Sequence, residues 1–519
     1  MATIPIVLLL LGALATWLAR RSHERFLWGI ATGTAVAVWA ATLGLGTSLP
    51  SAVSLSVWRP TDLFAARLEL VLDPIGWSFS YSTATLLLAV VLTGVARPGE
   101  ATPFGRAMML GYTALGLVAM LAGNLLTVAT AWALMDVATA VFLLGTIARG
   151  ASSMQGLVSR LAVDTTGVVL VVAAAVADWG AGGDAMLAQG LASGLAAGLL
   201  SLAVLLRLGL MPPHFILPAL PRIRLGLGTL LRLVPPAAGL CVLGRALEPM
   251  LPAALVPALR VAGVLGVVVG GFRWAMERDP IGSRRFLVLG LSGVGILAMT
   301  AMGEGPATMM AATGALLLLG GGVVSLGEIH TPAHRLWLAL GALLLAGLPG
   351  SVGGRLTVVL GSAFSDSGSW WVGAVGIAGL VALASGSARS VMAASTPWPT
   401  GESLVQLVYG AGLALPSLAA VGLGLWSRHS LSTAGVVVFL IGLTLAASAF
   451  RLSMRVPGRR FDRWQRVAAL VDPEPFYRFL WAAYRRITRW MRTVTAALEG
   501  GGAMLWTYVV LLLVVLSLQ

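Results

Sequence analysis

The chain has 519 residues, of which 58% are hydrophobic and 10% are charged. This composition provides too little polar surface for a water-soluble protein of this length and predicts an all-α, polytopic membrane protein. The formal net charge of +14 comes from arginine alone, since the sequence contains no lysine. Because the arginines gather in short loops between apolar segments, this charge indicates membrane topology and contact with anionic lipid, and argues against nucleic-acid binding.

The apolar segments predict about sixteen transmembrane helices, because a span needs about 20 apolar residues. The expected spans are 3–19, 27–48, 70–95, 107–123, 125–147, 161–178, 187–211, 227–246, 251–272, 286–302, 306–327, 336–361, 370–392, 405–426, 432–450 and 503–518. The first segment has no basic region before it and no small-residue cleavage site after it. It is therefore predicted to be a membrane helix and not a signal peptide.

Three of these segments are interrupted by proline and glycine. The seventh runs into MPPHFILPALP, the eighth contains RLVPP and the twelfth contains LAGLPGSVGGR. Proline inside a span removes backbone hydrogen bonds, so we expect broken helices near spans 7, 8 and 12. Transporters build ion sites at such breaks.

The distribution of arginine predicts the orientation of the chain. Arginines follow the first, third, fifth, seventh, ninth, eleventh and fifteenth segments, whereas the loops after even-numbered segments carry acids such as Asp184 and Glu304. By the positive-inside rule, both termini are expected on the non-cytoplasmic side. From Phe476 onward, aromatic residues alternate with arginines before the last span. This pattern predicts a short amphipathic helix that lies along the cytoplasmic surface, either as a lipid anchor or as a strut against a neighbouring subunit.

Ionisable residues inside the spans are functional candidates, because burying a charge in a membrane is costly. They are Asp136, Asp164, Arg207, Arg232, Arg245, Arg260 and Arg355. Arg207 and Arg232 lie next to the proline-interrupted stretches, and Arg355 lies in the interrupted twelfth segment. Arg245 and Arg260 lie near segment ends, where we expect their side chains to extend toward the membrane surface. An alternative for all of these charges is pairing that serves structure alone.

Cysteine and histidine give no sign of a metal or cofactor site. The single cysteine, Cys241, excludes internal disulfides and cysteine-based metal centres. Among the five histidines only His330 and His334 approach a metal-ligand spacing, and Pro332 separates them. We expect no bound metal, no cofactor and no catalytic residue in this chain.

Several motifs occur in a characteristic order: LDPIGWSFS (72–80), GNLLTVATAWALMD (123–136), RLGLMPPHFILPALP (207–221), ERDPIGSRRFLVLGLSGVGILAM (277–299) and LAGLPGSVGGR (345–355). In these motifs the chain resembles the antiporter-like, proton-conducting membrane subunits of complex I, energy-converting hydrogenases and multisubunit sodium/proton antiporters. The resemblance implies helices 1–3 in 1–106, a first antiporter-like bundle in 107–246 (helices 4–8), a second in 251–392 (helices 9–13), helices 14–15 in 393–450, the amphipathic segment in 451–502 and a final span in 503–519.

The resemblance also implies a central line of titratable residues that carries protons. Its glutamate position is Ala133, with Asp136 three residues later on the same helical face. The lysine position of the seventh span holds Arg207. The lysine of the eighth span corresponds to Ala237, with Arg232 more than a turn earlier, and that of the twelfth falls near Thr357, with Arg355 two residues earlier. The pathway candidates are Asp136, Asp164, Arg207, His214, Arg232 and Arg355. Because arginine keeps its proton, these residues cannot form a lysine relay.

The resemblance predicts a subunit of a complex-I-like assembly in the inner or plasma membrane, of NADH-quinone oxidoreductase or energy-converting hydrogenase type. The subunit would take part in, or structurally support, proton or cation translocation that is coupled to redox chemistry elsewhere. Its expected partners are other membrane subunits, protons or sodium ions, and lipid at the amphipathic helix. Two alternatives remain open: a non-conducting subunit with a locked Asp–Arg pair, and the proton-conducting partner of an inorganic-carbon uptake system.

Overall fold

The computed structural model describes residues 2–55, 67–96, 102–146, 151–211, 226–249, 251–276, 284–301, 305–327, 332–392, 402–426, 432–455, 482, 485–486 and 488–493. The chain divides into two compact units, Met1–Ala468 and Ala469–Gln519. In the second unit, residues 488–493 are helical, with Arg489, Trp490 and Arg492 exposed. The rest of the predicted amphipathic helix and the expected span at 503–518 lie outside the described residues.

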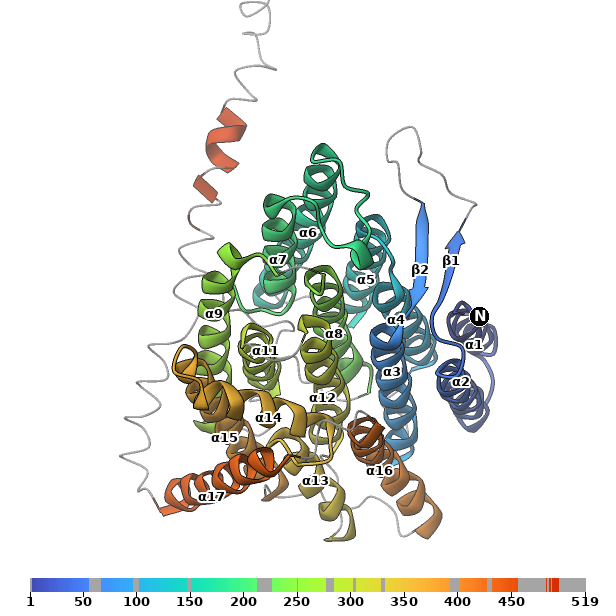
Figure 1. Cartoon of the computed structure of the whole chain (residues 1–519). Coiled ribbons are helices and arrows are strands. Elements are labelled where there is room, and N and C mark those ends of the chain that lie inside the picture. Colours follow the sequence, from blue (N-terminus) through green and yellow to red (C-terminus); the bar gives the residue numbers. More distant parts are fainter. Residues whose placement is uncertain are drawn as a thin grey trace, which may run out of the picture. The chain divides into compact units, whose positions relative to one another are not determined.

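The first unit is built from helices (Figure 1). Its α-helices are α1 (Ile4–Leu18), α2 (Glu24–Leu45), α3 (Pro74–Thr93), α4 (Pro103–Leu121), α5 (Leu125–Thr146), α6 (Ala151–Gly180), α7 (Gly194–Arg207), α8 (Leu227–Leu247), α9 (Val256–Leu265), α10 (Arg273–Met276), α11 (Arg284–Thr300), α12 (Pro306–Leu326), α13 (Pro332–Leu345), α14 (Val352–Ser365), α15 (Trp370–Met392), α16 (Ser403–Trp426) and α17 (Thr433–Arg455). Short 3-10 turns occur at η1 (Gly94–Ala96), η2 (Leu187–Gln189) and η4 (Ala253–Leu255), and η5 (Gly266–Phe272) is a π-helix.

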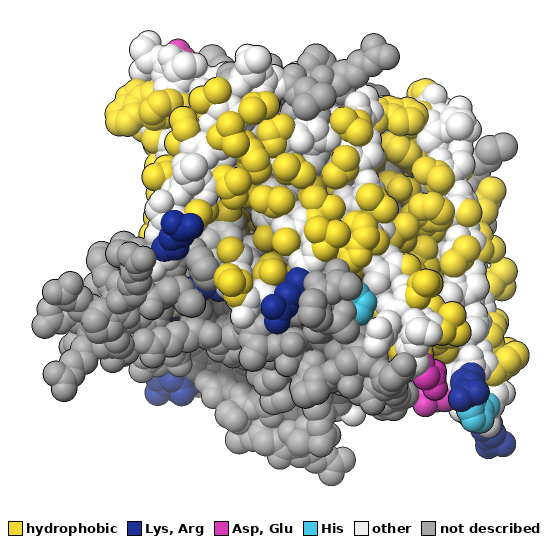
Figure 2. Space-filling view, turned by 90° about the horizontal axis from the view of Figure 1, so that it is seen from below, with side chains coloured by type: hydrophobic (Ala, Val, Ile, Leu, Met, Phe, Trp, Pro, Cys, Tyr) yellow, Lys and Arg dark blue, Asp and Glu magenta, His cyan; other side chains and the backbone are white. Residues whose placement is uncertain are grey.

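Within the described part of the chain, 10 helical segments are long and apolar enough to cross a membrane, and further apolar helices are shorter. Figure 2 shows a face on which most of the described side chains are hydrophobic, with charged side chains toward its edge. The chain is therefore an all-α, multi-pass membrane protein, as its composition predicts.

A small β-hairpin, which the sequence did not predict, precedes α3. Strands β1 (Ser51–Leu55) and β2 (Leu68–Leu72) pair antiparallel, with Ser51 opposite Leu72. The expected span at 70–95 therefore begins as strand, and its helix starts only at Pro74. Asp73 sets this start, because its carboxylate accepts a 2.6 Å hydrogen bond from the Gly76 N–H as an N-cap, and proline is favourable at the first helical position.

The three interrupted segments differ in the structure. Helix α7 ends at Arg207, followed by Gly209 with φ of 73°. The twelfth expected span consists of α13 and α14, separated by a turn with Gly347 and Gly350 at positive φ, where glycine avoids a Cβ clash. Helix α8 instead continues through Pro235 and Pro236. Its packing against α3, α4, α7 and α12 favours this continuous helix despite the hydrogen bonds that proline removes.

Helices α8 and α12 lie at the centre of the first unit, and nearly all of their residues are buried. They pack closely, since a Cβ added at Gly244 would lie 2.8 Å from the Cβ of Met310. Helices α4 and α7 contact α8, and α11 and α14 contact α12.

A second close contact joins η5 to α11. An added Cβ at Gly266 would lie 2.8 Å from the Cα of Gly293, and one at Gly270 would lie 2.7 Å from the Cα of Gly290. The two backbones therefore approach closely along a glycine-rich seam, a packing mode typical of membrane helices. A π-helix at such a contact is uncommon in proteins.

Candidate functional site

Asp136 and Arg207 form an ion pair between α5 and α7. The Arg207 Nη2 donates to Asp136 Oδ1 at 2.9 Å, and Nη1 donates to Oδ2 at 3.1 Å. Asp136 lies in the middle of α5, and Arg207 is the last residue of α7. Both residues are buried, with exposed fractions of 8% and 5%. The bidentate geometry matches the planar guanidinium to the carboxylate, which a lysine could not do.

The ring of Trp132 completes the surroundings of Arg207. Trp132 is fully buried, and the Arg207 Cζ lies 4.5 Å from the centroid of its ring. Trp132 and Asp136 are four residues apart on α5, so both lie on one face of the helix. Within the described structure, neither Arg207 Nε nor Trp132 Nε1 has a hydrogen-bond acceptor.

A second pair of opposite charges lies beside the first, on α6. Arg160 Nε donates to Asp164 Oδ2 at 3.1 Å, one helical turn apart, and both side chains are largely buried. Asp164 and Arg160 interact electrostatically with Asp136. The sequence-predicted candidates Asp136, Asp164 and Arg207 thus belong to one buried charge cluster on three neighbouring helices.

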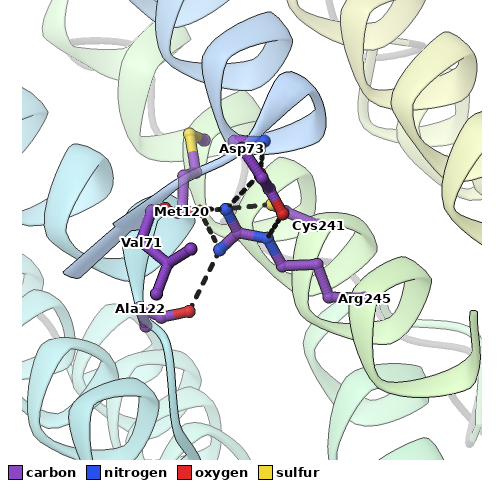
Figure 3. Close-up of polar contacts among 7 residues, drawn as sticks. Val71, Asp73, Met120, Ala122, Cys241 and Arg245 are labelled. Carbon is purple, nitrogen blue, oxygen red and sulfur yellow. Dashed lines mark hydrogen bonds and ion pairs between the residues drawn. The ribbon is translucent and has the colours of Figure 1, made fainter. Parts of the chain in front are cut away.

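A third buried ion pair joins Arg245 at the end of α8 to Asp73 at the start of α3 (Figure 3). Arg245 Nε and Nη2 donate to the two Asp73 carboxylate oxygens at 3.0 and 2.6 Å. Nη1 donates to the Met120 and Ala122 carbonyls at 2.7 and 3.0 Å, and Nη2 also donates to the Val71 carbonyl at 3.0 Å. All the nitrogen atoms of this guanidinium therefore donate to described acceptors.

This geometry corrects the expectation that Arg245 extends toward the membrane surface. Arg245 is 5% exposed and connects the β-hairpin, α3 and the α4–α5 junction to α8. Gly76, at the end of the LDPIG motif, leaves room for this guanidinium, because a Cβ there would collide with Arg245 Nη2. Arg260 is half-buried and donates to the Thr300 carbonyl at 3.1 Å, with its guanidinium 5.6 Å from the Trp371 ring.

The two interhelical Asp–Arg pairs differ in how completely the arginine is bound. Arg245 donates to one carboxylate and three backbone carbonyls. Arg207 donates to a single carboxylate and stacks on one ring. Loss of the carboxylate charge would leave Arg245 with three backbone acceptors besides the neutral carboxyl, whereas Arg207 would keep only the neutral carboxyl and the ring as direct contacts. Of these two pairs, the Asp136–Arg207 pair therefore depends more on the charge of its aspartate.

Comparison with known proteins agrees with this architecture. No protein-family model and no curated protein matches the chain. Among solved structures, a chain of the Mrp complex from Dietzia sp. DQ12-45-1b superposes with a TM-score of 0.73 at 17% identity, covering 100% of this chain and 62% of that chain. A chain of the membrane-bound sulfane sulfur reductase, an archaeal respiratory membrane complex, superposes with a TM-score of 0.63 at 14% identity, covering 86% of this chain and 97% of that chain.

The chain has the antiporter-like fold. The resemblance predicted from the sequence is thus confirmed for the fold. This chain spans about three fifths of the length of the Mrp chain that it matches.

The remaining candidates for the predicted pathway lie on other helices or outside the described residues. Arg232 is half-buried on α8 and interacts electrostatically with Arg284. Arg355 is half-buried in the first turns of α14. His214 lies outside the described residues, and so does His330 of the weak metal pair. In the part of the chain that the structure describes, no three acidic, histidine or cysteine residues are grouped for metal binding.

The positions that the sequence resemblance matched to lysines of the eighth and twelfth spans hold no titratable side chain. Ala237 is fully buried within α8. Thr357 is also buried, and its hydroxyl donates to the Gly354 carbonyl at 2.7 Å. Ala237 and Thr357 therefore add no charge to that of the Asp136–Arg207 pair.

Proposed function

We propose that this chain is a membrane subunit of a complex-I-like assembly, of NADH-quinone oxidoreductase or energy-converting hydrogenase type. It takes part in proton or sodium translocation that is coupled to redox chemistry in other subunits. The fold shared with a chain of the Mrp complex and with a chain of an archaeal respiratory membrane complex supports this assignment. Its partners are then the other membrane subunits of that assembly.

The buried Asp136–Arg207 pair is the observation that carries the proposal. Arginine keeps its proton under physiological conditions, so any change in the charge of this pair occurs on Asp136. Protonation of Asp136 leaves a buried cation without its counter-ion, which is costly in a membrane interior. The two helices then favour a different arrangement, and in this way a proton on α5 affects the end of α7.

The finer topology belongs to the same proposal. It comprises sixteen spans, the two helix bundles at 107–246 and 251–392, and both termini on the non-cytoplasmic side. The basic segment before the last span binds lipid and neighbouring subunits. The positive-inside distribution of arginine and the separation of α13 from α14 support this arrangement.

A locked structural pair is the second candidate function, and one observation favours it. The Arg207 side chain is 3% exposed, with both Nη atoms bound to one carboxylate and its face against Trp132. A pair held this firmly could fix α5 to α7 without ever opening. The chain would then be a non-conducting subunit.

The intact complex, purified from its own membranes, provides the test. Identifying the copurified subunits shows whether redox proteins are present. Proton and sodium movement is then followed in everted vesicles under an imposed ion gradient, with a pH-sensitive dye and with radioactive sodium. Asp136→Asn is expected to abolish ion movement per assembled complex, and Arg207→Lys to reduce it strongly.

The Asp73–Arg245 pair supplies the matched control. Asp73→Asn removes a partly buried carboxylate that is also paired with an arginine of another helix, and we expect it to lower the amount of assembled complex without changing ion movement per complex. If Asp136→Asn and Arg207→Lys leave ion movement at the wild-type level while only assembly falls, the structural role is correct and the translocation role is wrong.

A further inference from the structure

We propose that Trp132 is a positioning residue that holds Arg207 independently of Asp136. The indole ring then keeps its contact with the guanidinium when Asp136 is protonated, and Arg207 alternates between a state bound by both carboxylate and ring and a state bound by the ring alone. This inference rests on the proposed function, because it assigns a role to that same pair. It concerns a residue that lies outside the line of titratable groups.

The Asp136 carboxylate and the Trp132 ring contact the Arg207 guanidinium in different ways. The carboxylate of Asp136 accepts from the edge, through Nη1 and Nη2. The Trp132 ring contacts the guanidinium with its Cζ 4.5 Å from the ring centroid. A planar cation can make both contacts at once, so neither has to be released before the other forms. Loss of the carboxylate charge therefore leaves the ring contact in place.

Burial strengthens the cation–π attraction between Arg207 and the Trp132 ring. Trp132 is 0% exposed and Arg207 is 5% exposed, so water competes for neither group. The face of an indole ring is the most favourable aromatic surface for a cation, and the attraction increases when the pair is desolvated. With Asp136 neutral, this face remains in direct contact with the charge, and Asp164 of the same cluster attracts it from a greater distance.

The same geometry explains why arginine suits this position. A lysine ammonium is a compact charge that cannot lie flat on a ring while both oxygens of a carboxylate are bound by its edge. The Trp132 and Asp136 side chains, one turn apart on α5, form a clamp that fits a guanidinium. We infer that the absence of lysine here reflects this clamp.

The competing explanation is that Trp132 only fills space between α5 and its neighbours. A double-mutant cycle separates the two explanations, because a space-filling ring is indifferent to the charge of residue 207. Trp132→Leu and Trp132→Phe are each made in the wild-type chain and in the Arg207→Met variant. The same set is then repeated in chains that also carry Asp136→Asn. The thermal unfolding midpoint of the full-length chain is measured in detergent.

If the ring holds the cation, Trp132→Leu lowers the midpoint by about 2 °C more when Arg207 is present than in the Arg207→Met background, and the difference persists with Asp136→Asn. Trp132→Phe lowers the unfolding midpoint less than Trp132→Leu does, because a phenyl face remains against the guanidinium. Equal losses with arginine and with methionine overturn the proposal. A difference that disappears in Asp136→Asn also overturns it, since the ring would then act only through the carboxylate.

Ion movement provides a second readout that a purely structural role would not change. The ring carries a larger share of the stabilisation of Arg207 when Asp136 is protonated, so its removal destabilises the protonated state more than the ionised state. In Trp132→Leu half-maximal ion movement therefore shifts to lower pH, by about 0.5 to 1 unit. In Trp132→Phe the pH profile stays close to wild type. An unchanged profile in Trp132→Leu contradicts the two-state role. If wild-type vesicles show no ion movement, the proposed function fails, while the unfolding cycle still decides whether the ring holds Arg207.

Discussion

Replacing Arg245 by methionine tests how much one satisfied arginine stabilises this fold. The substitution removes two hydrogen bonds to Asp73 and three to backbone carbonyls of Val71, Met120 and Ala122. These acceptors belong to the β-hairpin, the start of α3 and the α4–α5 junction. Methionine retains much of the apolar stem of the side chain, so the loss is mainly polar.

The expected loss in the free energy of unfolding depends on how deeply the acceptors of Arg245 are buried. Removing one partner of a buried ion pair costs about 3–5 kcal/mol. The Asp73 side chain is 24% exposed, so water recovers part of the loss. We therefore expect Arg245→Met to lower the free energy of unfolding by about 3 kcal/mol. Arg245→Lys keeps the charge but fewer of the bonds, and we expect about half of that loss.

The measurement is denaturant unfolding of the purified full-length chain in detergent, followed by circular dichroism. Arg106→Met is the matched control, because Arg106 is also buried but its partner Glu24 is 44% exposed, with one bond of 2.7 Å. We expect the control to lose about 1 kcal/mol or less. If Arg245→Met loses no more than Arg106→Met, the complete set of bonds around Arg245 has no special importance and our reasoning is wrong.

Three further substitutions or reactions check other parts of the structure. Gly270→Ala should destabilise the chain by about 2 kcal/mol, because the new Cβ meets the backbone of Gly290. The control Gly33→Ala, which adds a Cβ in open space on α2, should stabilise the chain slightly. Equal effects of the two substitutions in unfolding experiments would contradict the close contact between η5 and α11. The Cys241 thiol is 0% exposed, so a maleimide reagent should label it only after denaturation, and rapid labelling of the folded chain would show that α8 opens. Asp178 accepts from two backbone N–H groups of the segment between α6 and α7, so Asp178→Ala should cost about 2 kcal/mol and speed proteolysis there; an unchanged cleavage rate would argue against this anchor.

Sequence analysis predicted the helical fold well because its signals are local. Hydropathy and the spacing of arginine suffice to locate apolar helices, and the positions of most expected spans agree with the helices found within the described residues. The β-hairpin was missed because β2 continues directly into an apolar helix, and the boundary at Asp73 depends on a cap that hydropathy does not register.

The candidate site was only partly predictable from sequence. Asp136 and Arg207 stood out because charge inside a span is rare, and the structure brings them together. The interior role of Arg245 was not visible, because its partner Asp73 is 172 positions away in the sequence. Trp132 was likewise overlooked, since a buried tryptophan has no distinctive pattern until its contact with Arg207 is seen.

The seam between η5 and α11 has an entropic consequence. Its glycines carry no rotamers, so these positions lose no side-chain entropy when the two helices come together. In a bilayer each helix forms before helices associate, and the large backbone entropy that glycine loses on folding is therefore lost before the seam closes. Association along this seam should weaken little with rising temperature, and α11 should remain attached to η5 after helix pairs that order many long side chains have separated.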